Sequence, residues 1–361
     1  MPNTLATTTL ILSLTLLNAQ TYKDPKTSLE ILEIAPPGAG TTNLYYHFSN
    51  FTADNRYAIF ASTAAGQAQI FAYEPATGKT RQLTQGAGVA AAAACPHPRN
   101  PQLVYYPRGA AIEELNVSTG AVRRVGEIPQ PRVGGTQQPS LSHDLKSLAL
   151  VKQREPANWE IGLMDIATGA WRTVAVVGFR VGHVQHHPSL PLIFYVWETG
   201  GYAPQRTWVV NDDGTANRPF YYTTDPKEWI TPLKEWVTHE SWVAGTGQIT
   251  MIVDKVGIVI AGPDGKGHLL PGQYWHVHAS EDGRFLVADD SGGNIWLIEA
   301  ATDSRRLLVT GYRDGVRAVH AHASFDRTGR YVFFNNGHTR QTVALIDLQQ
   351  QGVYSKPSWL P

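Results

Sequence analysis

The chain has 361 residues, and its 30 Lys plus Arg balance 30 Asp plus Glu, so the formal net charge at pH 7 is zero. A chain with this balance is not attracted to polyanions, which argues against a nucleic-acid or membrane-surface binder. The single cysteine, Cys95, excludes an internal disulfide framework and a cysteine-rich zinc module.

The first recognisable segment is the apolar run LILSLTLL at residues 10–17, which is too short to cross a bilayer. Together with the following Asn18-Ala19-Gln20 it predicts a signal peptide over residues 1–20 and a mature domain over residues 21–361. The first nine residues contain no Lys or Arg, so an uncleaved N-terminal extension is the alternative. We expect a periplasmic or secreted protein, or a cytoplasmic one under that alternative.

The rest of the chain consists of short apolar or alternating runs separated by Gly, Asp, Asn and Pro turns, and helical periodicity is nearly absent. An acidic-Thr-Gly turn recurs before an outer strand, most clearly in residues 71–78, 114–120 and 163–169. Inner strands are expected to start near residues 44, 88, 137, 181, 235, 274 and 318. A spacing of roughly 40 to 55 residues is typical of four-stranded propeller blades.

The pattern therefore predicts an all-β fold, a single seven-bladed β-propeller with four-stranded antiparallel blades. The run LEILEI at residues 29–34 precedes the first blade, and we expect it to pair with the last blade and close the ring. Closure removes the unpaired edges that an open ring would expose. Propellers of six or eight blades, or separate domains, are the alternatives.

Histidines concentrate at the expected inner strands of this repeat. Side chains at i and i+2 of a strand share a face, so each of the two H-x-H pairs places two imidazoles together. If the inner strands line the channel of a propeller, these imidazoles converge there. The polar residues expected in the channel are His47 in blade one, His183, Gln185 and His187 in blade four, His239 in blade five, His276 and His278 in blade six, and His320 and His322 in blade seven.

A single histidine on an inner strand is usually a hydrogen-bonded structural group. Eight of them in four successive inner strands, counting the neighbouring His186, instead indicate metal binding or catalysis, because convergent neutral imidazoles are ligands for divalent metals. His97 and His143 fall in turns and are expected to face solvent.

Three segments resemble oligogalacturonate lyases, a family of polysaccharide lyases built on a seven-bladed propeller. They are FYVWETGG with APQRTWVVN within residues 194–211, WVTHESW at 236–242, and HAHASF at 320–325 followed by Thr328-Gly329-Arg330. The resemblance extends over about residues 180 to 348, and the blade turns themselves are shared with many propellers.

The resemblance implies a metal-dependent enzyme that cleaves 4-linked uronides, such as pectin-derived oligogalacturonate, by β-elimination. It implies manganese as the cofactor, with another divalent metal as the alternative, and a uronic-acid oligosaccharide or polysaccharide as the substrate. The metal ligands that it implies are His276, His320 and His322. It further implies that His239 is the Brønsted base and that Arg206 assists catalysis.

This chemistry is consistent with the residue types. Removing the C5 proton of a uronate is difficult because the adjacent carboxylate is already negative. A cation and a guanidinium on that carboxylate stabilise the developing enolate, and a neutral histidine can then take the proton. Arginine suits the task because its planar group can form two hydrogen bonds to one carboxylate.

Several positions depart from the family pattern, among them Ala321 and Ala323, where the family has prolines. Arg317 replaces a glutamine that is a further metal ligand in the family, and His278 is an additional imidazole. The remaining metal ligand is then His278, Gln185 or water. Alternatively, Arg317 contacts the substrate instead. The residues expected to bind the substrate are His183, Gln185, Arg317 and His47. Ulvan- or rhamnogalacturonan-type uronides are the alternative substrates, and a non-catalytic propeller that binds other proteins is the alternative class. The oligomeric state is not predicted.

Overall fold

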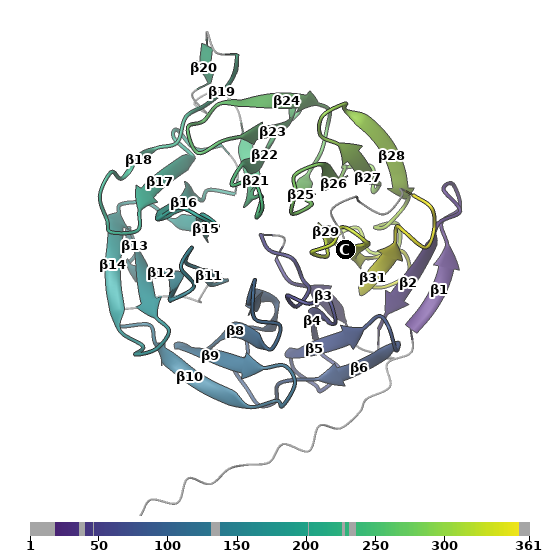
Figure 1. The fold of residues 1–361 in the computed structure, drawn as a ribbon, viewed down its shortest axis with the longest axis horizontal. Coiled ribbons are helices and arrows are strands. Elements are labelled where there is room, and N and C mark those ends of the chain that lie inside the picture. The colour runs from purple at the N-terminus through teal and green to yellow at the C-terminus, as the bar shows by residue number, and fades with distance from the viewer. Residues whose placement is uncertain are drawn as a thin grey trace, which may run out of the picture.

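Seven antiparallel sheets stand in a ring around a central channel, so the predicted all-β seven-bladed propeller is confirmed (Figure 1). The computed structural model describes residues 19–35, 40–45, 47–130, 138–200, 202–225, 228–230 and 236–353, with backbone only for 223–225 and 228–230.

In blades one to six the four strands follow one another in chain order from the channel to the rim. Blade one consists of β3 (Thr41–Asn43), β4 (Ala58–Ser62), β5 (Gln69–Glu74) and β6 (Lys79–Gln82). Blade two consists of β7 (Cys95–Pro96), β8 (Leu103–Arg108), β9 (Ala111–Asn116) and β10 (Val122–Glu127). Blade three consists of β11 (Ser140–Leu141), β12 (Ser147–Glu155), β13 (Asn158–Asp165) and β14 (Trp171–Val177). Blade four consists of β15 (Val181–His186), β16 (Leu192–Trp197), β17 (Thr207–Asn211) and β18 (Arg218–Pro219). Blade five consists of β21 (Val237–Trp242), β22 (Ile249–Val253), β23 (Gly257–Ala261) and β24 (Gly267–Pro271). Blade six consists of β25 (His276–Ala279), β26 (Phe285–Asp289), β27 (Ile295–Glu299) and β28 (Ser304–Val309).

Blade seven closes the ring and contains both ends of the propeller sequence. Its strands are β29 (Ser324–Phe325), β30 (Tyr331–Asn336), β31 (Thr342–Asp347), β2 (Glu30–Ile34) and β1 (Ala19–Lys23). Strand β2 pairs with β31 in the register Leu32 to Leu345, which confirms the predicted role of the LEILEI run. The fifth strand, β1, was not expected; it begins inside the predicted signal peptide, whose residues 1–18 lie outside the described residues.

The apolar core lies between the blades. Seven buried clusters occur, one at each interface between neighbouring blades; the blade 7/1 interface, for example, packs Phe333 and Val343 against Phe60 and Phe71. Alternating side chains of one strand point to the two neighbouring blades, so each blade is apolar on both faces. This packing fixes the inner strands around the channel.

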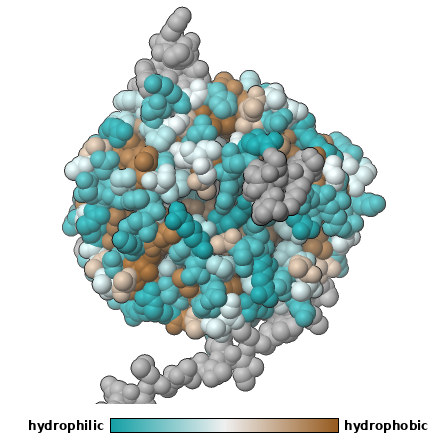
Figure 2. Space-filling view, viewed as in Figure 1, coloured by the Kyte–Doolittle hydropathy of each residue, from teal (hydrophilic) through white to brown (hydrophobic). Residues whose placement is uncertain are grey.

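The outer surface is mixed in character. Hydrophilic residues predominate on the face seen in Figure 2, and the large exposed hydrophobic residues are scattered over different blades, as with Val122, Val176 and Val256. A hairpin of β19 (Tyr222–Asp225) and β20 (Glu228–Ile230) projects from the rim between blades four and five (Figure 1). Within the described ranges, no helix has the length and apolar character needed to cross a membrane.

Candidate metal centre and catalytic channel

His276 is held rigidly at the start of β25. It lies opposite Asp289 of β26, and its Nδ1 is 2.8 Å and 3.1 Å from the two carboxylate oxygens of Asp289. Asp289 also accepts hydrogen bonds from the backbone N–H of His276 and from the hydroxyl of Tyr312. A carboxylate that holds one imidazole nitrogen fixes the tautomer, so Nε2 of His276 is the nitrogen that can coordinate a metal.

His320 and His322 come from an irregular segment before β29, and buried amides support its backbone. The side-chain amide of Asn335 donates to the carbonyl of His320 at 3.0 Å, and that of Asn43 donates to the carbonyl of His322 at 2.7 Å. Asn43 belongs to blade one and Asn335 to blade seven, and the backbone N–H of Asn43 donates to the side chain of Asn335. The two amides thus fix both histidines at the blade 7/1 interface.

The three histidines converge. One ring nitrogen from each of His276, His320 and His322 lies within 4.8 Å of the others, which is close enough for one ion to bind all three. His322 and His276 are in edge contact, with ring centroids 4.5 Å apart. Nitrogen ligands about 2.0–2.2 Å from a divalent metal fit a group of this size, so the side chains present match the predicted metal.

The structure does not bring His278 into this group. Its Nδ1 accepts a hydrogen bond from the backbone N–H of Phe325 at 3.4 Å, and its side chain lines a second cavity with Cys95 and Trp242. On the regular strand β25, residues i and i+2 share a face but lie about 6.6 Å apart along it. His276 and His278 therefore reach different levels of the channel.

His183, His239 and His322 occupy equivalent backbone positions with unusual dihedral angles. Each lies three residues before the last residue of the inner strand of its blade. Their φ angles are 48°, 54° and 42°. In blades four and five this is a β-bulge, because the pairing register shifts between Gly182 and Gln185 and between Thr238 and Ser241. Bulges of this kind redirect a side chain, and left-handed φ in a residue with a Cβ is associated with functional sites.

The bulge places the His239 ring beside the metal-ligand candidates. Its centroid is 4.1 Å from that of His276 and 5.4 Å from that of Trp275. Burial, followed by the neighbouring His276, holds the pKa of His239 well below its usual value. The imidazole is therefore neutral at pH 7, as a proton acceptor must be.

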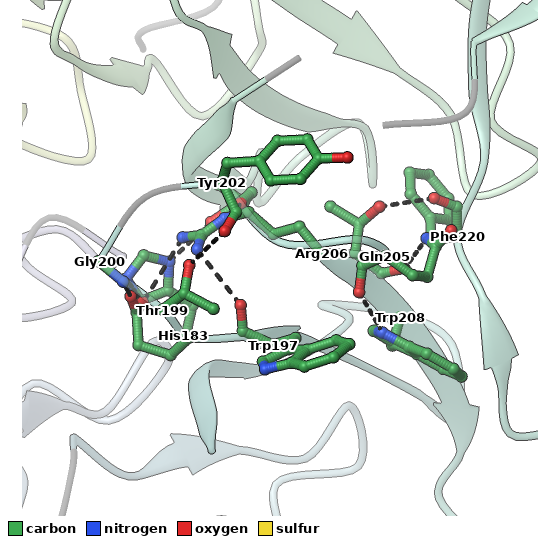
Figure 3. Close-up of polar contacts among 12 residues, drawn as sticks. His183, Trp197, Thr199, Gly200, Tyr202, Gln205, Arg206, Trp208 and Phe220 are labelled. Carbon is green, nitrogen blue, oxygen red and sulfur yellow. Dashed lines mark hydrogen bonds and ion pairs between the residues drawn. The ribbon is translucent and has the colours of Figure 1, made fainter. Parts of the chain in front are cut away.

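A buried carboxylate, Glu240, connects His183 with Arg206. Its Oε2 accepts a hydrogen bond from Nδ1 of His183 at 2.6 Å, and its Oε1 accepts one from Nε of Arg206 at 3.0 Å. Burial alone would raise the pKa of Glu240, but the Arg206 charge and the His183 hydrogen bond outweigh it and lower that pKa to about 2. Figure 3 shows the Arg206 side chain extending toward His183, with a guanidinium nitrogen near the carbonyl of Trp197.

One cavity of about 590 Å³ lies beside this network. Its lining residues include His183, Arg206 and His239, and the aromatic rings of Trp236 and Trp275 form part of its wall. A volume of this order accommodates a small oligosaccharide segment.

The other predicted substrate-binding residues are more dispersed. His47 lines this cavity as well as the second one, and its ring is 5.0 Å from that of His183. Gln185 is fully buried and donates to the backbone carbonyl of Glu240 at 2.7 Å, so the bulge has separated it from the face of His183. Arg317 has an exposed side chain on the rim before His320 and is not among the residues that line the cavity.

Sequence reasoning missed several supporting residues. Asp289 was missed because only the strand register places it opposite His276, and Asn43 and Asn335 were missed because their contacts cross the blade 7/1 interface. The signal that could have identified Asp289 is its acidic side chain at the end of the otherwise apolar run FLVAD in β26.

Comparison with known proteins agrees with this fold. No protein-family model matches the sequence, and no curated protein matches it. Among solved structures, an oligogalacturonate lyase in complex with manganese superimposes with a TM-score of 0.81 at 18% identity, covering 94% of this chain and 98% of that one. An oligogalacturonate lyase from Vibrio parahaemolyticus gives a TM-score of 0.80 at 18% identity, covering 94% and 99%. The resemblance noted in the sequence is thus confirmed at the level of the fold, and this chain has the propeller fold of oligogalacturonate lyases.

Proposed function

We propose that this chain is a metal-dependent lyase that cleaves 4-linked uronides by β-elimination, with oligogalacturonate as the first substrate to test. The observation that carries the proposal is the convergence of His276, His320 and His322 beside His239, which itself lines a cavity together with Arg206. The fold shared with two oligogalacturonate lyases, one of them in complex with manganese, supports it.

His276, His320 and His322 would hold the metal, and Mn²⁺ is the proposed ion. A divalent cation bound there supplies positive charge for the substrate carboxylate and for the enolate that forms from it. Asp289 keeps Nε2 of His276 directed at the ion by binding Nδ1. Water would supply the remaining ligands, because His278 points to another level of the channel, the amide of Gln185 is bonded to the carbonyl of Glu240, and Arg317 cannot coordinate a metal.

Arg206 is proposed to bind and orient the uronate carboxylate. Its guanidinium is buried and is oriented by Glu240 at 3.0 Å, while Glu198 lies 3.5 Å from its Nη2. Because Glu240 is ionised across the working pH range, Arg206 is already fixed before substrate binds. Preorganised charge of this kind stabilises the transition state without a reorganisation cost.

His239 is proposed to remove the C5 proton. The ring is neutral because it is buried, and an anionic uronate bound beside it favours the imidazolium that forms. As the proton moves to His239, the C4–O bond breaks and the departing oxygen takes up a proton. His183 and His47, on the same cavity wall, are proposed to contact the sugar hydroxyls.

The decisive experiment measures the ultraviolet absorbance of the unsaturated uronide product. The metal-depleted protein would be incubated with galacturonate oligomers, with and without Mn²⁺, and then with glucuronate, ulvan and rhamnogalacturonan substrates. Metal-dependent product formation supports the proposal, and the panel identifies the uronide. A folded, Mn²⁺-loaded protein that forms no product from any uronide would contradict the enzyme assignment and favour a binding propeller.

A further inference from the structure

A second group of metal-ligating side chains lies outside the cavity just described. His143 belongs to the turn between β11 and β12 of blade three, His186 ends β15 of blade four, and Asp212 belongs to the turn between β17 and β18. One ligand atom from each of the three lies within 4.8 Å of the others. Sequence reasoning placed His143 in solvent, but its ring stacks on that of His186 with centroids 5.3 Å apart.

The distances in this group fit a small metal ion. Nε2 of His186 is 3.3 Å from Oδ2 of Asp212, and Nδ1 of His143 is 3.7 Å from the same oxygen. Two ligand atoms that are each about 2.0–2.1 Å from a tetrahedral zinc ion lie about 3.3 Å apart. The separations are therefore close to the edges of a coordination tetrahedron.

Hydrogen bonding around the group also favours a ligand. Nδ1 of His143 is buried and has no hydrogen-bond partner among the residues that the structure describes, which is a costly arrangement for a ring nitrogen unless something else engages it. Nδ1 of His186 lies 3.0 Å from the carbonyl of His187 and 3.2 Å from the backbone N–H of His143. These two backbone contacts orient the ring so that its Nε2 faces Asp212.

The His143 and Asp212 side chains are 29% and 21% exposed, which leaves a route for an ion and room for a water ligand.

We propose that His143, His186 and Asp212 form a second divalent-metal site, which binds Zn²⁺ between blades three and four. Two imidazoles and one carboxylate are a donor set that zinc prefers, with water in the fourth position. The ion would connect the inner strand and outer turn of blade four to the inner turn of blade three. This role is structural and is independent of the proposed lyase reaction.

The test isolates this site from the first one. In a His320→Ala/His322→Ala background, which removes two of the three ligands of the other cluster, metal-depleted protein would be titrated with Zn²⁺ by calorimetry. We expect one bound equivalent and a rise in Tm of about 3–5 °C at saturating Zn²⁺. Adding Asp212→Asn should weaken Zn²⁺ binding at least 100-fold and abolish the rise.

A matched control is available in the same turn. The carboxylate of Asp213 accepts hydrogen bonds from Thr215 in its own loop and is not part of the metal-ligand group, so Asp213→Asn should retain the bound equivalent. Because Asp212→Asn is isosteric, far-ultraviolet circular dichroism can confirm that the fold is intact, and His143→Gln provides a second test with the same expected loss. The proposal is overturned if the background protein binds no Zn²⁺, or if Asp212→Asn and Asp213→Asn bind it equally well.

Discussion

Blades two and three have the same antiparallel build as blades four to seven but present different side chains to the channel. At the position three residues before the last residue of the inner strand, blade two carries Ala93 and blade three carries Gln138. The same position holds the following histidines in blades four to seven: His183, His239, His276 and His322. The fold repeats a backbone position around the ring, and the occupant of that position determines the chemistry.

Catalysis offers the strongest way to test this comparison. His239→Ala should lower kcat by about 10³-fold or more while leaving bound Mn²⁺ in place, since the ring is the proposed proton acceptor rather than a ligand. Gln138→Ala, at the matching position of blade three, should change kcat less than about 10-fold, since it removes neither base nor ligand. Steady-state kinetics and metal content measure both. Equal losses would mean that the two halves of the ring do not differ in function.

Metal binding is expected to depend on blade seven. His322→Ala should weaken Mn²⁺ binding by at least about 100-fold, and part of the activity should return at high Mn²⁺ concentration. Titration of the metal-depleted protein, followed by activity at each Mn²⁺ concentration, tests this. Retention of tight Mn²⁺ binding by this variant would remove His322 from the ligand set.

Removing the hydrogen bond that supports the proposed ligand His276 is expected to have a smaller effect on Mn²⁺ binding. Asp289→Asn removes the carboxylate that fixes the His276 tautomer, so Mn²⁺ affinity should fall by about 10–100-fold. Asp290→Asn is the matched control, because Asp290 bonds Asn294 and Trp296 instead of a histidine. If both variants bind Mn²⁺ equally, the tautomer argument is wrong.

The smallest expected effect concerns the pH dependence of stability. The pKa of Glu240 falls from 4.5 to about 2 on folding, so its ionised form stabilises the native state above pH 4.5, and this stabilisation is lost as the pH falls toward 2. The difference in unfolding free energy between wild type and Glu240→Gln should therefore be constant above pH 4.5 and shrink below it. Urea denaturation at a series of pH values measures this, and a difference that grows on acidification would contradict it.

The propeller could be predicted from the sequence because its turns are local. Each Asp-Gly or Thr-Gly turn is defined by a few adjacent residues, and regular spacing between such turns then gives the blade period. Ring closure by residues 29–34 was predictable for the same reason, since a spare strand must pair with an open edge.

Side-chain direction in the channel was less predictable. The i, i+2 rule assumes a regular strand, but His183 and His239 lie in bulges with left-handed φ, and His320 and His322 lie in an irregular segment. On the regular strand β25 the rule held, so His276 and His278 share a face. They nevertheless lie at different heights along the strand and do not meet at one ion. The partnership of His143 with His186 and Asp212 could not be read from the sequence, because it needs the contact between two blades.

Blade seven has a consequence for how the proposed metal would be loaded. Its candidate ligands His320 and His322 lie in the segment that leads into a sheet which is completed only when β2, from before the first blade, pairs with β31. During synthesis blade seven must therefore be made, and must pair with the much earlier β2, before the ion has a complete binding site. Loading of the ion would then follow ring closure, and it would favour the closed ring over a partly assembled intermediate.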